Sequence, residues 1–344
     1  MKLIDNLRRD MDSGEIVSNG KLPTLRQLAE HYQCGITTVK RAFDALEKEG
    51  LLCVVRGQGN FVVGSADMTL PKKSRIIGAI LSNGEFMSEL TAVKEKYLHS
   101  GWVFSIYDSS VNRQSPAMEK LFLTSAGAEN FSAFIVSASP REPVNKELFM
   151  QLRSKGSKII HISSYIDDMS DESYFLPDYR QAAELAVWKI AVAGYRKFIF
   201  VNREQTAPHV RQIQSGVDNV IGDAGLTMLD NFTVRHKETE AIHAHLAKLP
   251  PDTAVLCFDT ELGEIVRWCA ERCGLTAPEN FGLVSLLNVF GVNAGHSHML
   301  ISTAQIVGDV LAYAVNERLN PFDKVQKTYR FTFCDKGTLK STNQ

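Results

Sequence analysis

The stretch LPTLRQLAEHYQCGITTVKRAFDALEKEGLLCVVRGQGNFVV, residues Leu22–Val63, decides how the N-terminal part of this chain is organised. Its first half predicts two short helices separated by a break near Cys34, with the second helix over Thr37–Lys48. Apolar residues at positions i, i+4 and i+7 of that second helix form one stripe that a protein core can bury. The residues of this stripe are Val39, Phe43 and Leu46.

The other face of the second helix is polar, and a β-hairpin follows the helix. Gly50 ends the helix, and LLCVV, RGQG and NFVV then predict a strand, a tight turn and a second strand. Two helices followed by such a hairpin make a winged helix, whose second helix fits the major groove of DNA. We therefore predict an α+β winged helix-turn-helix DNA-binding domain over residues 1–64. Its polar helix face carries Thr37, Thr38, Lys40, Arg41 and Asp44.

Length and composition limit what surrounds this domain. A chain of 344 residues predicts two or three domains. Residues 1–64 hold nine lysines and arginines against eight aspartates and glutamates, so DNA affinity must come from where the charges lie. We expect no signal peptide and no membrane span. The six scattered cysteines predict free thiols in the cytoplasm, where a regulator would associate with the nucleoid.

A regular pattern of strands and helices begins after a short linker. The residues after Val63 are small, polar and basic, so residues 65–74 are predicted to be a linker. From residue 75 to residue 344, apolar strands alternate with amphipathic segments, which predicts parallel sheets covered on both faces and divided into two lobes. The predicted strands are Ile76–Leu81, Val103–Tyr107, Ala133–Val136, Lys158–Ile162, Lys197–Val201, Ala254–Phe258 and Gly282–Leu286. The predicted helices include Glu85–Ser100, Arg180–Ala193, His209–Ala224 and Glu261–Cys273.

The N-terminal motifs resemble a known family. LPTLRQLA, GITTVKRAFDALEKEGLL and GQGNFV are similar to the winged-helix domain of GntR-type bacterial regulators, in the same order and spacing. The resemblance implies that Arg26 and the start of the second helix contact DNA. One departure is that Gly35 and Ile36 stand where the family usually has Ser-Arg, which predicts an altered operator sequence.

The second region resembles another family. SRIIGAIL, AFIVSAS, LPDYRQAAELAVWKIAVAGYRKFIFV and VLCFDTELGEIVRWCAERCGLTAPENFGLVSL are similar, in their order, to the effector domain of LacI/GalR regulators. This resemblance implies a two-lobed α/β fold of the type I periplasmic-binding-protein kind, joined by three crossovers. A GntR-type winged helix on such a domain is similar to the arabinose repressors. It implies a homodimeric repressor of carbohydrate-utilisation genes that binds operator DNA and a sugar or sugar derivative, without a membrane partner.

The DNA-contact prediction has alternatives at three places. Arg26 is expected to contact DNA, and the alternative is a solvated side chain. Thr37 either faces DNA or caps the helix, and Ile36 is expected to touch a thymine methyl group. The turn either enters the minor groove or is an ordinary hairpin turn. The predicted DNA-binding residues are Arg26, Ile36, Thr37, Thr38, Lys40, Arg41, Arg56, Gly57, Gln58 and Gly59.

The effector-binding prediction centres on Asp259. This carboxylate follows the apolar strand VLCF, and parallel sheets bind ligands at the carboxyl ends of their strands. The alternative is a capping or solvated role, and Asp178 has the same two interpretations. Arg211 stands near the place of the family's effector-binding Arg, where this chain has Ile213. The predicted effector-binding residues are Phe86, Ser137, Asp178, Arg211, Asp259 and Asn288.

Catalysis, metals and cofactors have little support in the sequence. No G-x-S-x-G or H-E-x-x-H motif is present, and GQGN lacks the Lys-Ser/Thr of a phosphate-binding loop. Cys269 and Cys273 with His296 and His298 suggest a zinc site, but packing is the favoured interpretation. We predict a non-enzyme with no cofactor and no metal.

Two other functions stay open. One is a GntR-type regulator fused to an enzyme-like domain, although the chain is too short for the aminotransferase-containing branch. The other is a small-molecule-binding protein whose effector is not a sugar, or whose N-terminal domain serves protein contacts. The sequence leaves open the effector, the operator, the direction of regulation and the oligomeric state.

Overall fold

The computed structural model divides the chain into two compact units. The first comprises Met1–Ser82, Leu90–Tyr174 and Gly308–Gln326, and the second comprises Asn83–Glu89, Phe175–Val307 and Lys327–Gln344. The chain therefore passes between the units near residues 174, 307 and 326, in addition to the short segment 83–89. The structure describes residues 2–16, 21–49, 51–55, 59–62, 74–81, 84–108, 116–128, 130–137, 145–166, 169, 172–203, 208–235, 239–288, 294–319 and 323–341.

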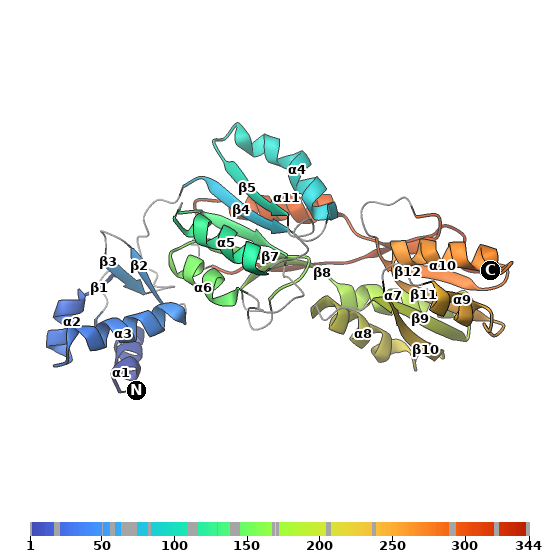
Figure 1. The fold of residues 1–344 in the computed structure, drawn as a ribbon, viewed down its shortest axis with the longest axis horizontal. Coiled ribbons are helices and arrows are strands. Elements are labelled where there is room, and N and C mark those ends of the chain that lie inside the picture. Colours follow the sequence, from blue (N-terminus) through green and yellow to red (C-terminus); the bar gives the residue numbers. More distant parts are fainter. Residues whose placement is uncertain are drawn as a thin grey trace. The chain divides into compact units, whose positions relative to one another are not determined.

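The N-terminal elements form the predicted winged helix (Figure 1). Two antiparallel pairings join its strands in the order β1-β3-β2, so the hairpin β2–β3 gains a third strand from the segment before α2. The elements are α1 (Lys2–Asp12), β1 (Lys21–Leu22), α2 (Leu25–His31), α3 (Ile36–Lys48), β2 (Leu52–Val55) and β3 (Gly59–Val62).

Local sequence explains where these helices begin and what they bury. Thr24 and Gln27 form a capping box at the start of α2, in which the Gln27 amide donates to Thr24 Oγ1 at 3.3 Å and the Thr24 amide donates to Gln27 Oε1 at 2.9 Å. The predicted stripe of α3 is buried, as are Leu7 of α1 and Leu28 of α2, and together they form one core. The polar face of α3 is exposed, as predicted.

One six-stranded sheet, in the order β14-β8-β7-β6-β4-β5, lies largely in the first unit, and its strands β8 and β14 cross the boundary into the second. Its strands β5, β4, β6 and β7 pair in parallel, and helices α4 and α11 cover one side while α5 and α6 cover the other (Figure 1). The elements are β4 (Ile76–Leu81), α4 (Gly84–Leu98), β5 (Val103–Asp108), α5 (Pro116–Ala128), β6 (Ala133–Val136), α6 (Lys146–Ser154), β7 (Lys158–Ile162), β8 (Ser173–Pro177), α11 (Thr303–Ala314) and β14 (Gln326–Tyr329).

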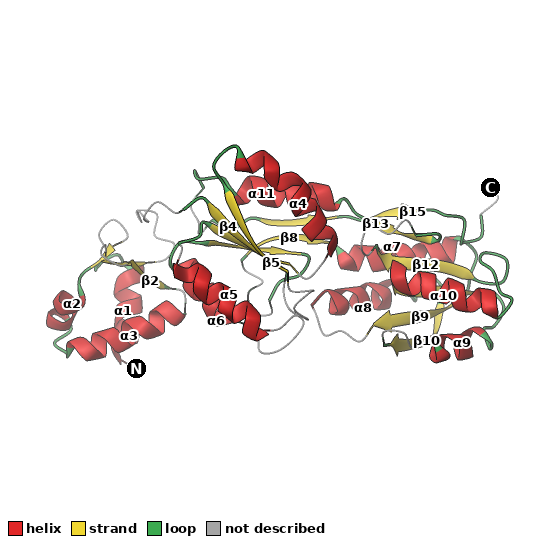
Figure 2. Ribbon diagram, turned by 45° about the horizontal axis from the view of Figure 1, so that its top comes forward, coloured by secondary structure: helices red, strands yellow, loops and turns green. Residues whose placement is uncertain are grey.

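The second unit has its own six-stranded sheet, in the order β10-β9-β11-β12-β13-β15. The first five strands are parallel, and β15 closes the edge antiparallel to β13. Helix α7 packs with α8 and helix α9 with α10, so helices lie on both faces of the sheet (Figure 2). The elements are α7 (Tyr179–Val192), β9 (Lys197–Arg203), α8 (Pro208–Val220), β10 (Thr227–Val234), α9 (Glu240–Leu246), β11 (Thr253–Asp259), α10 (Thr260–Arg272), β12 (Gly282–Leu287), β13 (Ser297–Leu300) and β15 (Thr332–Cys334).

All seven predicted strands are present, and the predicted α+β winged helix and two-lobed α/β architecture are confirmed. Most of the additional strands are exposed or short, which explains why the pattern did not predict them. Strand β10 lies at a sheet edge and exposes most of its residues, while β13, β14 and β15 have three or four residues each. Strand β15 also makes the second sheet mixed, whereas the pattern predicted parallel pairing alone. Among the described residues, no helix is long and apolar enough to span a membrane.

One buried histidine gives the first unit a defined pH dependence. His161 is fully buried in β7 opposite Val136, and neither ring nitrogen has a hydrogen-bond partner within the described residues. Burial lowers the pKa of His161 to about 4, so the native chain keeps this ring neutral. The unfolded chain binds a proton near pH 6.5, which means that native stability is complete above that pH and falls as the pH drops towards 4.

We expect His161→Leu to remove this acid-sensitive part of the stability. Between pH 7 and pH 4 the wild type should lose about 3 kcal/mol more unfolding free energy than the variant. Urea unfolding followed by circular dichroism at several pH values measures the difference. Parallel pH profiles for the two proteins would show that His161 is not held neutral in the native state.

Candidate DNA-binding face and effector site

The exposed face of α3 brings together most of the predicted DNA-binding residues. Thr37, Thr38, Lys40 and Arg41 all lie on the solvent side of this helix. Ile36 opens the helix with half of its surface exposed, and with Arg26 of α2 it borders a shallow hollow at the turn between the two helices. Two elements therefore present two arginines, a lysine, hydroxyl groups and one apolar side chain on the outside of the winged helix.

The N-terminus of α3 differs from the prediction by one residue, and this decides the alternative for Thr37. The N-cap is Gly35, which has no side chain to cap the helix, so Thr37 lies inside the first turn and is not the cap. At the hairpin, Gly59 opens β3 at φ 124°, and an added Cβ would lie 3.3 Å from Lys21 Nζ. A backbone of this kind favours glycine. Arg56, Gly57 and Gln58 lie outside the described residues.

In the second unit, Asp259 lies at the carboxyl end of β11 and begins α10. Its Oδ1 accepts the Leu262 amide at 2.8 Å, so the carboxylate is the N-cap of the helix. The side chain is nearly buried. Capping was the alternative to ligand binding, and the structure shows the capping geometry directly.

Arg203 is the residue that the sequence pattern missed at this edge. It ends β9, the strand beside β11, and its Nε donates to Asp259 Oδ2 while its Nη2 donates to Asp259 Oδ1 at 3.1 Å. Nη2 also reaches Glu261 Oε2 at 2.6 Å. Burial alone would lower the pKa of the Arg203 guanidinium, but the two carboxylates outweigh it and raise that pKa. One feature of the sequence could have indicated this contact. Arg203 comes just after the predicted strand Lys197–Val201, and the carboxyl ends of neighbouring parallel strands meet at one edge of a sheet.

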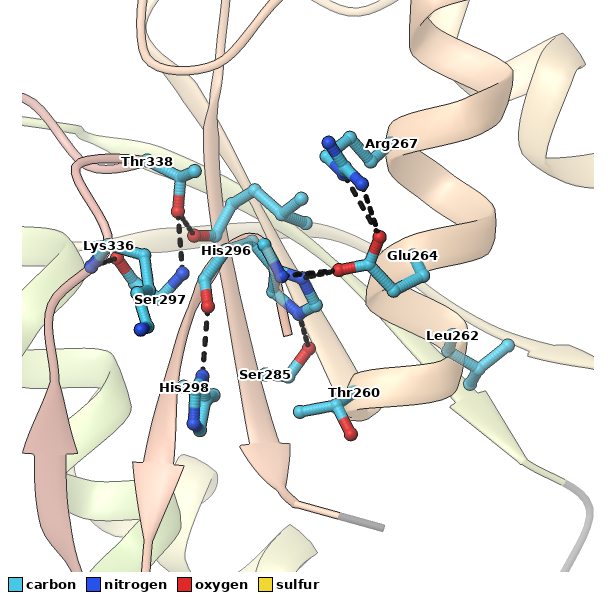
Figure 3. Close-up of polar contacts among 12 residues, drawn as sticks. Thr260, Leu262, Glu264, Arg267, Ser285, His296, Ser297, His298, Lys336 and Thr338 are labelled. Atoms are coloured by element: carbon cyan, nitrogen blue, oxygen red, sulfur yellow. Dashed lines mark hydrogen bonds and ion pairs between the residues drawn. The ribbon is translucent and has the colours of Figure 1, made fainter. Parts of the chain in front are cut away.

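A hydrogen-bond network fixes the first turn of α10 against the sheet (Figure 3). His296 is fully buried, with Nε2 at 2.7 Å from Ser285 Oγ of β12 and Nδ1 at 2.9 Å from Glu264 Oε1 of α10. Glu264 also accepts from the Gly295 amide at 2.8 Å and from Arg267. Burial raises the pKa of Glu264, but these donors outweigh burial and lower it. Because a carboxylate only accepts, neutral His296 carries its proton on Nδ1, and Nε2 accepts from the Ser285 hydroxyl.

This network has the connectivity of a Ser-His-Glu catalytic triad, which the sequence motifs did not predict. Ser285 and His296 are both fully buried, and Ser285 lies within the central strand β12. A catalytic nucleophile must contact its substrate, and Ser285 is buried. The network therefore serves to hold α10 in position against the sheet.

The remaining predicted effector residues belong to different elements of the fold. Asn288 follows β12 and accepts from Thr260 Oγ1 at 3.3 Å, which puts it beside the start of α10. Asp178 caps α7 by accepting the Gln181 amide at 3.1 Å. Arg211 is exposed on α8. Phe86 is buried in α4, and Ser137 is buried after β6 in the first unit, where its amide donates to the Ile80 carbonyl at 2.8 Å.

Helix α8 buries the position at which the resemblance to the family predicts an effector-binding arginine. Ile213, at the family's position, is fully buried in the core. Gly216 of the same helix packs closely on α7, and an added Cβ would lie 2.9 Å from the Ala183 Cβ. Position 213 of this helix therefore faces the protein interior.

The suggested zinc site is not formed by the described residues. In that part of the chain, no group of three or more His, Cys, Asp or Glu side chains is arranged to hold a metal ion. Cys269 is buried, and Cys273 Sγ lies 3.6 Å from His243 Nδ1. His296 is engaged in the network described above.

The fold defines a two-part class of protein, a winged helix joined to a doubly wound α/β region. Comparisons agree with this class. Residues 2–62 match the family of bacterial regulatory proteins called gntR. The chain is 24% identical over 171 residues to the arabinose metabolism transcriptional repressor of Halalkalibacterium halodurans, in an alignment that covers 47% of this chain and 44% of that repressor. It therefore spans less than half of that relative's length.

Solved structures share the fold of the α/β region. A putative ribose operon repressor from Burkholderia thailandensis superposes with a TM-score of 0.62 at 15% identity, over 76% of this chain and 100% of that one. A LacI-family protein from Silicibacter pomeroyi gives a TM-score of 0.64 at 17% identity over 93% of this chain and 100% of that one. The chain thus joins a GntR-type winged helix to a LacI-type α/β fold, the architecture expected from the resemblance to arabinose repressors.

Two helical glycines provide a matched test of the network at α10. An added Cβ at Gly263 would overlap the His296 ring and lie within 2.5 Å of Ser285 Oγ, whereas Gly308 of α11 has nothing within 4 Å. Gly263→Ala should destabilise the chain by about 1–3 kcal/mol through overpacking. Gly308→Ala should stabilise it by up to about 1 kcal/mol, because alanine favours a helix. Urea unfolding of both variants checks the signs, and a stabilised Gly263→Ala would contradict the close contact with His296.

Proposed function

We propose that this chain is a ligand-responsive bacterial transcription regulator, a repressor of carbohydrate-utilisation genes that works in the cytoplasm at the nucleoid. The observation that carries the proposal is the exposed polar face of α3 in a winged helix that matches the gntR family. A recognition helix with hydroxyl and cationic groups at its N-terminal half suits contacts with base edges and phosphates. We also propose the domain division predicted from the sequence: a winged-helix DNA-binding domain over residues 1–64, a linker over residues 65–74 and a two-lobed ligand-binding domain over residues 75–344.

The effector end of the proposal is supported by Asp259 and by the ligands of similar proteins. Asp259 and Asn288 lie at the carboxyl ends of neighbouring parallel strands, the usual ligand-binding edge of such sheets. A LacI-family regulator from Enterococcus faecium, with a TM-score of 0.60, 12% identity and coverage of 78% of this chain and 100% of that one, was solved with bound ribose. We extend this to a sugar-class effector here, with no enzymatic step and no cofactor.

Regulation would follow from linkage between the two ligands. Palindromic operators present two half-sites about one helical turn apart, so we propose a homodimer that places two winged helices on them. An effector that changes their spacing changes operator affinity, and the operator must change effector affinity by the same factor.

Substitution of the exposed cations tests the DNA-binding half. Lys40→Gln and Arg26→Gln should each weaken binding to a fluorescent duplex selected from a random library. Each should also reduce the slope of log affinity against log salt by about 0.9 for every phosphate that the variant no longer neutralises. Lys48→Gln, at the other end of α3, is the matched control. If all three variants bind like the wild type, the winged helix serves protein contacts, as in the alternative function.

Asp259→Asn tests the effector half without removing the helix cap. Asparagine caps helices as well as aspartate does, and Glu261 remains as a partner for Arg203, so the fold should persist while the negative charge of Asp259 is removed. A bound effector at about 100 times its dissociation constant adds about 2.7 kcal/mol of stability to the wild type, measurable as a thermal shift. We expect that shift to disappear in the variant and to persist in the control Asp252→Asn, an exposed aspartate at the opposite end of β11. An unchanged shift in Asp259→Asn would remove Asp259 from the effector site.

A further inference from the structure

The hydrogen bonds that Arg203 already makes leave only a few of its N–H donors to bind a ligand. A guanidinium has five N–H donors, and three of those of Arg203, on Nε and Nη2, are used by Asp259 and Glu261. Within the described residues, the two donors on Nη1 have no acceptor. Arg203 can therefore donate to a ligand oxygen without leaving its carboxylates.

Asp259 is close to saturation in the same arrangement. Its Oδ1 accepts from Leu262 and Arg203, and its Oδ2 accepts from Arg203. An ionised carboxylate has about four acceptor sites, so one site on Oδ2 is left among the described contacts. Hydroxyl groups both donate and accept, so a ligand with several of them can accept from Arg203 Nη1 with one hydroxyl and donate to Asp259 Oδ2 with another.

The net charge of the side chains at this edge favours uncharged, hydroxyl-bearing ligands over anionic ones. One guanidinium and two carboxylates leave the cluster of Arg203, Asp259 and Glu261 with one net negative charge. Arg203 and Asp259 are largely buried, which strengthens their field, whereas Arg211 and Arg235 are exposed and screened by water. His209, which packs near Phe258 with ring centroids 6.1 Å apart, adds no charge because burial lowers its pKa to about 4.

We propose that Arg203 is a specificity-determining residue which, held between Asp259 and Glu261, selects an uncharged, hydroxyl-bearing effector and rejects sugar phosphates and sugar acids. This inference rests on the proposed function, because it assumes that the effector binds at Asp259. A phosphate or carboxylate would need a cation with free charge, and the charge of Arg203 is already compensated by its two partners.

The test uses the full chain and matched compounds in thermal-shift and calorimetric titrations. The probes are the aldopentoses, common aldohexoses and pentitols, each neutral aldose compared with its phosphate ester and its aldonic acid. At least one neutral compound should bind, and its charged counterparts should bind at least tenfold more weakly. Tighter binding of a phosphate or aldonate would overturn the inference and leave an anionic effector for the same regulator.

Glu261→Gln tests whether the charge of this cluster causes the rejection of anionic ligands. Glu261 is partly exposed, so the variant should fold, and removing its charge should raise affinity for the charged counterpart at least tenfold relative to the neutral compound. Glu271→Gln, at the far end of α10, should leave the ratio unchanged. An unchanged ratio in Glu261→Gln would also overturn the inference.

Failure of the inference and failure of the proposed function give different results. A chain that binds none of these compounds contradicts a hydroxyl-bearing effector. If its DNA binding still depends on Lys40, the regulator proposal survives and only the effector class is wrong. If DNA binding is also absent, both fail.

Discussion

The pairing of Asp259 with Arg203 is the interaction on which the carboxyl edge of the second unit depends. A helix that begins directly after a buried strand leaves amide groups without partners, and Asp259 satisfies one of them from inside the protein. A nearly buried carboxylate needs compensation, and Arg203 supplies it from the neighbouring strand. Capping, charge compensation and the proposed ligand contact thus all use one side chain, so they are joint properties of Asp259 rather than alternatives.

The network behind α10 complements this pairing. Asp259 holds the start of the helix, and Glu264 ties its first turn to Gly295 and His296. Gly263 lets the ring of His296 come close to the helix backbone. These two anchors, five residues apart, hold the N-terminal part of α10, where the proposed ligand group lies, against the sheet.

Most of the fold was predictable because its strands and helices carry strong periodic patterns. The stripe of Val39, Phe43 and Leu46 and the apolar run around Ala254–Phe258 each fix an element without knowledge of the tertiary structure. Short or exposed strands such as β10 and β15 depend on partners far along the chain, so their own residues predict little. For the site, strand order puts Asp259 at the right edge. The contact with Arg203 could not be read directly, because it requires knowing that β9 and β11 are neighbours, and the DNA-binding and effector assignments remain predictions.

The discontinuity of the two compact units has a consequence for synthesis on the ribosome. The elements of the winged helix come from one continuous segment and are complete once β3 has emerged. The first sheet, however, lacks α11 and the edge strand β14 until residues beyond 326 have been made, and the second sheet lacks β15 until residue 334 has been made. Through most of translation, both large sheets therefore keep an uncovered face or edge. Nascent chains stalled before residue 326 would present a finished winged helix joined to unfinished α/β units, whose exposed apolar surface is prone to aggregation.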